Sequence, residues 1–156
     1  TVAPRRLTVL GMNAAELEAN PVAAERVIAD LNASPRLPFA DGSFDDAVCC
    51  VSIDYLTRPV EVMREVARVL RPGGRFVCTF SNRCFPTKAV RGWLAAGEPE
   101  RPAIVQAYFA ASGAFGAATA VKRRPEARHD PLWAVWAARL EGDVRQAPLR
   151  ARPAAG

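Results

Sequence analysis

Two apolar segments joined by a helix-patterned segment place the strongest constraint on the fold of this chain. The apolar segments are residues 46–51 and 75–80, and residues 59–70 between them carry apolar side chains at helical spacing. The turn Pro72-Gly73-Gly74 ends the helix. Parallel strands need a long connection across the sheet, so this order predicts a right-handed strand–helix–strand unit. Such sheets bind ligands at the carboxyl ends of their strands.

The rest of the chain extends this unit into a larger sheet. Apolar segments at residues 6–10 and 26–29 predict two earlier strands, and residues 117–121 and 132–137 predict a closing hairpin. Further helices are expected over residues 13–20, 86–96 and 101–112, the first beginning at an Asn13 N-cap with Glu16 in a capping box. We therefore predict an α/β, Rossmann-like sheet, mostly parallel with an antiparallel C-terminal strand and with helices on both faces.

Size and composition favour one folded domain. The chain has 156 residues, of which 50% are hydrophobic and 24% charged, as in globular proteins. We expect the domain to span residues 1–140, followed by a basic flexible tail over 141–156. No apolar run approaches the roughly 20 residues of a membrane helix, and no signal peptide is apparent. These features predict a cytoplasmic protein without membrane contact.

Cysteine and histidine usage argues against a metal site or a disulfide framework. Four cysteines lie at positions 49, 50, 78 and 84, and His129 is the single histidine. Neighbouring residues on a strand point to opposite faces, so Cys49 and Cys50 cannot bind one metal ion together. Cysteines in buried strands act as small apolar residues and suit a reducing compartment.

The net charge is +5, and many of the basic residues that cause it lie late in the sequence, from Lys122 to Arg152. An anionic partner such as nucleic acid would explain it, and so would a solvated basic surface. We favour the second explanation, because no aromatic interleaving or nucleic-acid motif accompanies the charge.

Two stretches carry a resemblance to a known family. The first is Leu37-Pro38-Phe39-Ala40-Asp41-Gly42-Ser43-Phe44-Asp45, and the second is Glu65-Val66-Ala67-Arg68-Val69-Leu70-Arg71-Pro72-Gly73-Gly74. In sequence and spacing they resemble the small methyltransferase domains of the class I S-adenosylmethionine (SAM)-dependent methyltransferases. The resemblance covers roughly residues 6–140. It implies methyl transfer from SAM to a small-molecule acceptor.

One part of the family pattern is absent from this sequence. The family's first strand and the glycine-rich loop after it have no counterpart, since residues 1–6 are few and contain no glycine. In the family that strand lies centrally in the sheet. We expect either a piece of a longer protein or a degenerate domain, with exposed ladder groups on two neighbouring strands and poor stability in isolation.

The resemblance also assigns cofactor residues. Gly11, Met12 and Asn13 follow the strand whose end receives the cofactor's ribose, with Asn13 where the family has an acid; ribose binding would then be weaker or shared with Glu16. Asp30 and Leu31 occupy the adenine position, and Ser52 lies where the methyl-bearing sulfonium is expected. Asn13 is equally explained as an N-cap, and Asp30 as the end of a strand.

Catalytic residues are less well defined by the sequence. Asp54 and Tyr55 are candidates for contact with the acceptor, and Asp54 for a general base where the acceptor must lose a proton. A solvated loop carboxylate is the simpler interpretation of Asp54. Arg83 is a candidate for holding an anionic substrate, although an ordinary surface arginine is the simpler interpretation. Aromatic residues could cap the acceptor pocket, although their spacing is more typical of a core: Trp93, Tyr108 and Phe109.

Two other functions remain open at this point. The chain could be a non-catalytic remnant that binds a partner, or a nicotinamide-dependent oxidoreductase on a similar sheet. The second lacks its glycine fingerprint, and His129 has no apparent triad partner for hydrolase chemistry.

Overall fold

The computed structural model describes residues 4–123 and 130–142. The chain divides into two compact units, Thr1–Pro35 and Arg36–Gly156. His129 and the predicted tail from residue 143 onward lie outside the described residues.

The first unit is a strand–helix–strand arrangement. Strands β1 (Thr8–Gly11) and β2 (Glu25–Ile28) pair in parallel, with Thr8 opposite Glu25 and Gly11 opposite Ile28. The connecting helix α1 (Ala14–Glu18) begins after Asn13, whose side chain accepts hydrogen bonds from the first helical turn. The predicted strands and N-cap are therefore confirmed.

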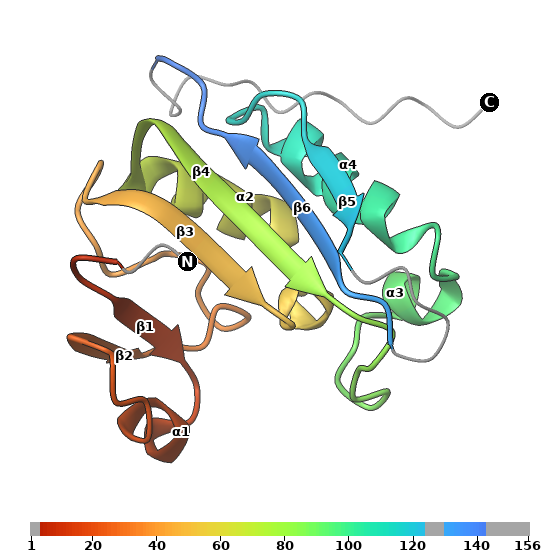
Figure 1. Cartoon of the computed structure of the whole chain (residues 1–156), viewed down its shortest axis with the longest axis horizontal. Helices are drawn as coiled ribbons and strands as arrows, with labels where there is room; N and C mark the ends of the chain where they lie inside the picture. Colours follow the sequence, from red (N-terminus) through yellow and green to blue (C-terminus); the bar gives the residue numbers. More distant parts are fainter. Residues whose placement is uncertain (1–3, 124–129, 143–156) are drawn as a thin grey trace. The chain divides into compact units, whose positions relative to one another are not determined.

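The second unit contains a four-stranded sheet in the order β3-β4-β6-β5 (Figure 1). Strands β3 (Phe44–Cys50) and β4 (Leu70–Phe80) are parallel, and helix α2 (Pro59–Val69) connects them. Strand β6 (Trp133–Ala138) runs antiparallel between β4 and β5 (Thr119–Lys122). The crossover unit and the antiparallel last strand inserted beside its neighbour are both as predicted.

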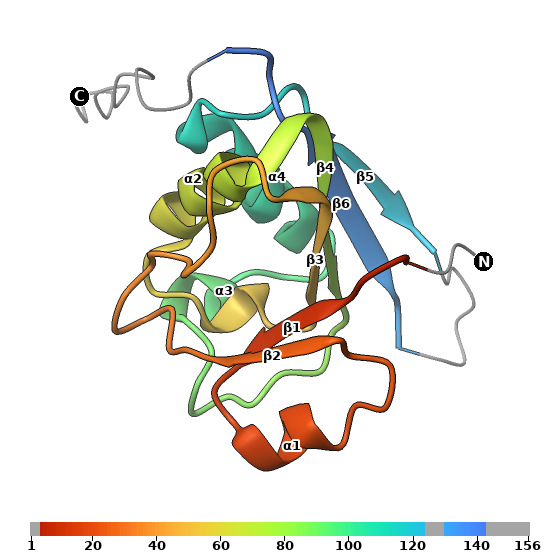
Figure 2. The same cartoon turned by 90° about the vertical axis from the view of Figure 1, so that its left-hand side faces the viewer.

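Helices cover one face of this sheet (Figure 2). Helix α2 and helix α4 (Arg101–Ser112) pack over it, and Phe76, Cys78 and Phe80 of β4 are buried beneath them. Phe109 of α4 lies edge-on to Phe76, with ring centroids 5.7 Å apart. Trp93 packs edge-on against Phe80 at 5.0 Å. Trp93 and Phe109 are thus core residues, as their spacing suggested.

The second predicted helix is shorter than the sequence pattern indicates. Helix α3 spans only Arg91–Ala95, whereas the apolar pattern predicts residues 86–96. The amides of Lys88 and Ala89 bond back to the carbonyl of Phe85, which closes a turn. The amide of Val90 donates to the carbonyl of Asp54 at 2.9 Å, and Val90 is extended. This long-range bond interrupts the helix, and a local pattern does not contain it.

Strand β3 has one strand neighbour within the described part of the chain. Its ladder bonds go to β4, and no other strand pairs with its second edge among these residues. Val48 in the middle of β3 is 62% exposed, which is unusual for an apolar strand residue. These are the features expected for a strand that lacks a neighbour.

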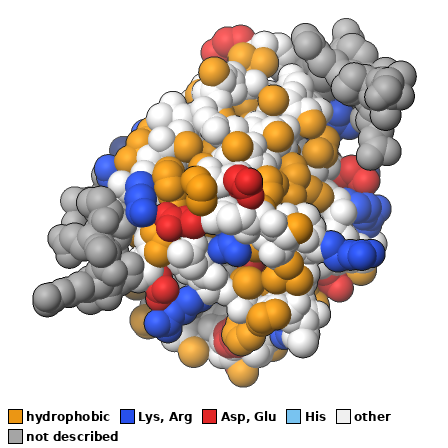
Figure 3. Space-filling model, turned by 90° about the vertical axis from the view of Figure 1, so that its right-hand side faces the viewer, with side chains coloured by type: hydrophobic (Ala, Val, Ile, Leu, Met, Phe, Trp, Pro, Cys, Tyr) orange, Lys and Arg blue, Asp and Glu red, His pale blue; other side chains and the backbone are white. Residues whose placement is uncertain are grey.

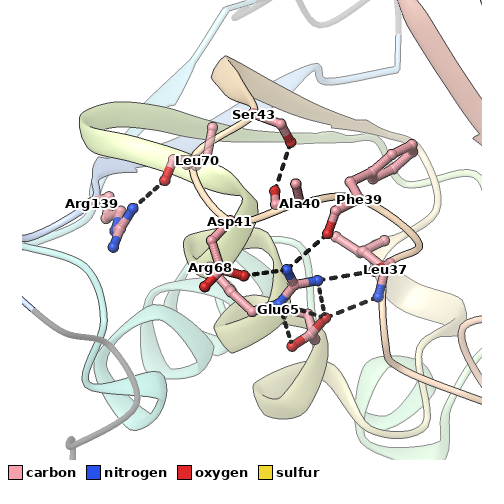
Figure 4. Close-up of polar contacts among 9 residues, drawn as sticks. All are labelled: Leu37, Phe39, Ala40, Asp41, Ser43, Glu65, Arg68, Leu70 and Arg139. Atoms are coloured by element: carbon pink, nitrogen blue, oxygen red, sulfur yellow. Dashed lines mark hydrogen bonds and ion pairs between the residues drawn. The ribbon is translucent and has the colours of Figure 1, made fainter.

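The side chain of Arg68 joins helix α2 to the segment before β3 (Figure 4). Its guanidinium donates to the carbonyls of Leu37 and Phe39 at 2.9 and 2.8 Å. It also contacts the carboxylates of Asp41 and Glu65, at 2.6 and 2.8 Å. Glu65 in turn accepts a hydrogen bond from the amide of Leu37 at 3.0 Å. We call this network, formed by Leu37, Phe39, Asp41, Glu65 and Arg68, the Arg68 clamp.

The Pro-Gly-Gly segment lies within β4 rather than in a separate turn. Gly73 has a φ of +76°, which favours glycine, and its amide donates to the carbonyl of Arg139 at 3.1 Å. A Cβ on Gly74 would lie 2.5 Å from the carbonyl oxygen of Asp45 and 2.9 Å from that of Arg71. Only glycine therefore allows this close approach of β4 to β3.

Replacing Gly74 tests that constraint. Gly74→Ala should lower the free energy of unfolding by about 1–3 kcal/mol, because the new methyl group overlaps backbone atoms. Gly92→Ala is the matched control: its Cβ would meet nothing within 4 Å, and it lies in α3. We expect that change to raise stability by about 0.5–1 kcal/mol. Urea denaturation measures both, and equal effects would contradict the constraint.

Replacing Arg68 tests the clamp. Arg68→Ala leaves two carbonyls and the partly buried Glu65 without their donor, so we expect a loss of about 2–4 kcal/mol. Arg71→Ala serves as control, since Arg71 pairs with Asp45 and both side chains are more than half exposed. Its loss should stay below about 0.5 kcal/mol. Thermal unfolding followed by circular dichroism would show whether the two arginines differ.

Candidate functional site

The ends of β1 and β2 bring the predicted nucleoside-binding residues of the first unit to one edge. The amide of Ala29 donates to the carbonyl of Gly11 at 3.0 Å, so the two strands end side by side. Met12 and Asn13 follow β1, and Asp30 and Leu31 follow β2. The structure thus places these residues at adjacent strand ends, while their contact with a cofactor stays a prediction.

Asn13 performs the capping role that the sequence suggested. Its side-chain oxygen accepts hydrogen bonds from the amides of Ala15 and Glu16, at 3.1 and 3.4 Å. An amide side chain has a single acceptor oxygen. Any ribose hydroxyl that donates to Asn13 must share that oxygen with the helix.

Asp30 shapes the turn after β2. One of its carboxylate oxygens accepts from the amide of Asn32 at 2.8 Å, and its carbonyl accepts from the amide of Ser34 at 3.0 Å. A carboxylate offers about four acceptor positions, so this turn leaves capacity for an amine donor. Beside it, Met12 is 68% exposed and Leu31 is partly buried, which offers apolar surface for a flat ring.

The end of β3 is the corresponding edge of the second unit. Val51 has a φ of +43°, a strained conformation for a β-branched residue, yet its amide still bonds to the carbonyl of Thr79 at 2.8 Å. Strain of this kind concentrates at binding and catalytic sites. Ser52 follows it, exposed, with its hydroxyl 3.3 Å from the sulfur of Cys49.

Asp54 lies in the short helix η1 (Ile53–Tyr55) and is only 3% exposed. Burial raises the pKa of its carboxyl group, while its own backbone amide, the Tyr55 hydroxyl and the charge of Arg101 oppose the rise. The hydroxyl of Tyr55 accepts from the amide of Phe85 at 3.0 Å. Burial also raises the pKa of Tyr55. Both candidates therefore lie at the strand end where they were predicted.

The second unit also contains two buried hydrogen-bond donors. Sequence analysis did not identify either of them as a polar group of the site. The guanidinium of Arg101 lies 5.4 Å from the centre of the Trp93 ring. Trp93 Nε1 and Arg101 Nε are buried without a hydrogen-bond partner among the described residues. Arg101 is the first residue of α4, and its position relative to Asp54 is a long-range feature that no local motif signals.

The other charged candidates have protein partners. Arg83 pairs with the carboxylate of Asp130, and Lys122 lies 2.7 Å from Glu98. On the face shown in Figure 3, basic and acidic side chains lie beside one another rather than in one basic patch. Among residues 4–123 and 130–142, no cluster of three or more metal-ligating side chains exists. No helix in that part is long and apolar enough to cross a membrane.

The predicted site residues therefore form two groups. Gly11, Met12, Asn13, Asp30 and Leu31 belong to the first unit, and Ser52, Asp54 and Tyr55 to the second. Each group lies at the carboxyl ends of strands, as expected for a Rossmann-like sheet.

Comparison with known proteins finds a family model that matches the first half of the chain. A family model described as "Methyltransferase domain" matches residues 5–78, which include both strand-end groups and the Arg68 clamp. Residues 5–78 therefore match the methyltransferase domain family. This confirms the resemblance to class I SAM-dependent methyltransferases, and it favours them over nicotinamide-dependent oxidoreductases.

Curated relatives agree over short segments. The methyltransferase GfsG of Streptomyces halstedii is 49% identical over 51 residues, 33% of this chain and 18% of that protein. The demethylmenaquinone methyltransferase of Mycobacterium sp. (strain KMS) is 48% identical over 56 residues, 33% of this chain and 24% of that protein. The matched segments thus span less than a quarter of either relative.

Solved structures share the fold over most of the chain. A SAM-dependent methyltransferase from Thermotoga maritima, described as a possible histamine N-methyltransferase, has a TM-score of 0.60 at 15% identity. The match covers 85% of this chain and 72% of that one. A SAM-dependent methyltransferase from Aquifex aeolicus has a TM-score of 0.59 at 13% identity, covering 86% and 69%. At this identity the likeness establishes the Rossmann-like fold alone.

The cofactor of this family is SAM, and the donor set of the chain suits its nucleoside half. Ribose hydroxyls and the adenine amine are hydrogen-bond donors, and the two strand ends of the first unit offer the acceptor oxygens of Asn13 and Asp30. Asp30 retains acceptor capacity, whereas the single oxygen of Asn13 is already shared. The fit is therefore good at the adenine position and poorer at the ribose position.

The pH dependence of stability tests the environment of Asp54. Its folded-state pKa is raised by burial, so its ionisation costs stability as the pH rises through that pKa. The stability of Asp54→Asn minus that of the wild type should therefore increase from acidic to neutral pH. Thermal melts of both proteins between about pH 4 and 8 measure this difference. A difference that falls with increasing pH would contradict a burial-raised pKa.

Proposed function

We propose that this chain takes part in SAM-dependent methyl transfer to a small-molecule acceptor. The observation that carries the proposal is the position of the polar side chains: they follow the carboxyl ends of β1, β2 and β3, within the residues that match the methyltransferase family. Because the matched segments span a small part of each curated relative, the activity is proposed for the protein to which this sequence belongs.

The first unit supplies the nucleoside contacts in this proposal. Asn13 accepts a ribose hydroxyl, with the exposed carboxylate of Glu16 in the same helical turn available as a second acceptor. Asp30 accepts the adenine amine through the carboxylate capacity that the turn leaves unused. Met12 and Leu31 provide apolar contact for the adenine ring. Gly11 ends β1 and lets the chain turn into α1.

The second unit supplies the residues nearest the transferred group. When bound, SAM supplies an electrophilic methyl group on a sulfonium. Ser52, exposed beyond the strained Val51, is the proposed contact at that position. Positioning provides much of the rate in such a displacement, which suits a rigid strand end. Asp54 accepts a proton where the acceptor must lose one, and a raised pKa makes its carboxylate a stronger base. The neighbouring Tyr55 hydroxyl opposes the rise in the Asp54 pKa.

For the methyl acceptor we propose only the broad class of small organic molecules. Relatives include a demethylmenaquinone methyltransferase and a sterol 4-C-methyltransferase from Caenorhabditis elegans, whose names refer to different acceptors. The free cysteines at positions 49, 50, 78 and 84 agree with the proposed cytoplasmic location, because reduced thiols are typical of the cytosol.

A second candidate is a non-catalytic module that keeps part of the fold. The double use of the Asn13 oxygen favours it, and so does the pairing of β3 with a single strand among the described residues, since both weaken a cofactor site. The two candidates differ in whether the nucleoside contacts are functional, and an affinity measurement separates them.

Calorimetry on matched variants tests the proposed function. S-Adenosylhomocysteine, the demethylated product, should bind the wild type, and Asn13→Asp should bind it about tenfold tighter. Aspartate caps helices as well as asparagine does, and its extra acceptors make charge-assisted bonds to ribose. Asn20→Asp is the control: Asn20 caps the Val22 amide in the same unit, away from the strand ends.

The outcomes distinguish the candidates. Tighter binding to Asn13→Asp with no change in Asn20→Asp supports the nucleoside site, since both variants add the same charge. Absence of binding heat with all three proteins supports the non-catalytic module. Binding of NAD in place of S-adenosylhomocysteine would overturn the proposed cofactor.

A further inference from the structure

Two cysteines lie opposite each other on the paired strands β3 and β4 of the second unit. The parallel register of β3 and β4 places Cys49 opposite Cys78. Side chains alternate along a strand, and Cys78 lies between the buried residues Phe76 and Phe80, on the helix-covered face. Residues directly opposite each other on paired strands point to the same face, so both thiols lie on this face. They therefore form a neighbouring pair rather than two isolated core cysteines.

The strand geometry suits a bond between these sulfur atoms. Neighbouring strands lie about 4.7–4.9 Å apart, and disulfides join residues whose Cα atoms are about 4.4–6.8 Å apart. Cys50 is a built-in contrast, because it is opposite Thr79 and exposed on the other face of the sheet. A disulfide within this strand pair thus has one available pairing.

The two thiols differ in their exposure to solvent and in the direction of their pKa shifts. Cys49 lies on the strand with a single described neighbour and is partly exposed, whereas Cys78 is fully buried. The hydrogen bond from Cys78 lowers the pKa of Cys49 against the effect of burial, with a further contribution from Ser52. The same pairing raises the pKa of Cys78. Cys49 is thus the more accessible nucleophile, and Cys78 lies in position to react with its oxidised form.

We propose that Cys49 and Cys78 form a redox-active dithiol, which a hydroperoxide converts into a disulfide between β3 and β4. The Cys49 thiolate attacks one peroxide oxygen, forming an S–O bond and breaking the O–O bond; the other oxygen leaves as water or an alcohol after taking a proton. The Cys78 sulfur then attacks the Cys49 sulfenic acid. An S–S bond forms, the S–O bond breaks, and the hydroxyl leaves as water with the Cys78 proton.

The bond would act on the strand end that carries Ser52. In the reduced protein the Cys49 sulfur lies 3.3 Å from the Ser52 hydroxyl, and a disulfide draws that sulfur toward Cys78. Oxidation therefore removes a contact that positions Ser52. This consequence rests on the proposed function, which assigns Ser52 to the cofactor, whereas disulfide formation itself does not.

Peroxide treatment of a variant with two remaining cysteines tests the disulfide. In Cys50→Ser/Cys84→Ser the exposed Cys50 and the partly exposed Cys84 are removed, and the wild type is treated in parallel. After hydrogen peroxide, the monomer should lose two hydrogens in mass and show no thiol reactive with maleimide after denaturation. Dithiothreitol should restore both thiols. Two reactive thiols, disulfide-linked dimers, or Cys49 sulfinic acid beside a free Cys78 would overturn the proposal.

A single further substitution tests the order of events. Cys78→Ser in the same background should leave Cys49 as a sulfenic acid that dimedone traps. Cys49→Ser should leave the buried Cys78 unmodified. Dimedone labelling of Cys78 instead of Cys49 would overturn the assigned roles.

Calorimetry on reduced and oxidised protein tests the consequence for Ser52. The oxidised form should bind S-adenosylhomocysteine more weakly than the reduced form. An unchanged affinity of a protein shown to carry the disulfide would overturn the link to Ser52. Failure of the proposed function appears differently, as absence of binding by the reduced protein.

Discussion

The second unit depends on the hydrogen bonds and ion pairs that the Arg68 guanidinium makes. The guanidinium holds two backbone carbonyls and two carboxylates, so one side chain sets the position of the segment before β3 against helix α2. Glu65 completes the network by accepting the Leu37 amide. The two stretches that resemble methyltransferases are therefore halves of a single structural clamp. They resemble the family because they build its scaffold, while the polar residues at the strand ends are the ones for which we propose a chemical role.

Local sequence patterns predict the secondary structure correctly wherever a segment's structure depends on its own side chains. The apolar run of β3, the amphipathic α2 and the Asn13 cap were predicted because periodicity and capping are short-range properties. Helix α3 was predicted too long, because the Val90 amide binds the distant Asp54 carbonyl. For the same reason, the position of Arg101 near Asp54 could not be predicted. In the candidate site, each residue's place at a strand end was predictable, and its hydrogen-bond partners from other segments were not.

Capping and the proposed cofactor binding would use the same side-chain oxygen atoms in the first unit. Asn13 and Asp30 both use side-chain oxygens to close the turn that follows their strand. A carboxylate can close a turn and still accept another donor, but a carboxamide has one oxygen for both tasks. The substitution of an amide for the family's acid thus preserves the fold while reducing the capacity for ribose. Intact local structure at this edge is consequently weak evidence for cofactor affinity.

The end of β3 shows how the scaffold maintains a strained site. The positive φ of Val51 costs on the order of 1–3 kcal/mol, and contacts on both sides of it offset that cost. Before the bend, the Val51 amide completes the ladder to Thr79; after it, the Asp54 carbonyl accepts the Val90 amide. These bonds join the end of β3 to β4 and to the start of α3. Ser52 and Asp54 are therefore held by long-range bonds on either side of the bend, so the geometry of this edge depends on the sheet and the α3 segment folding together.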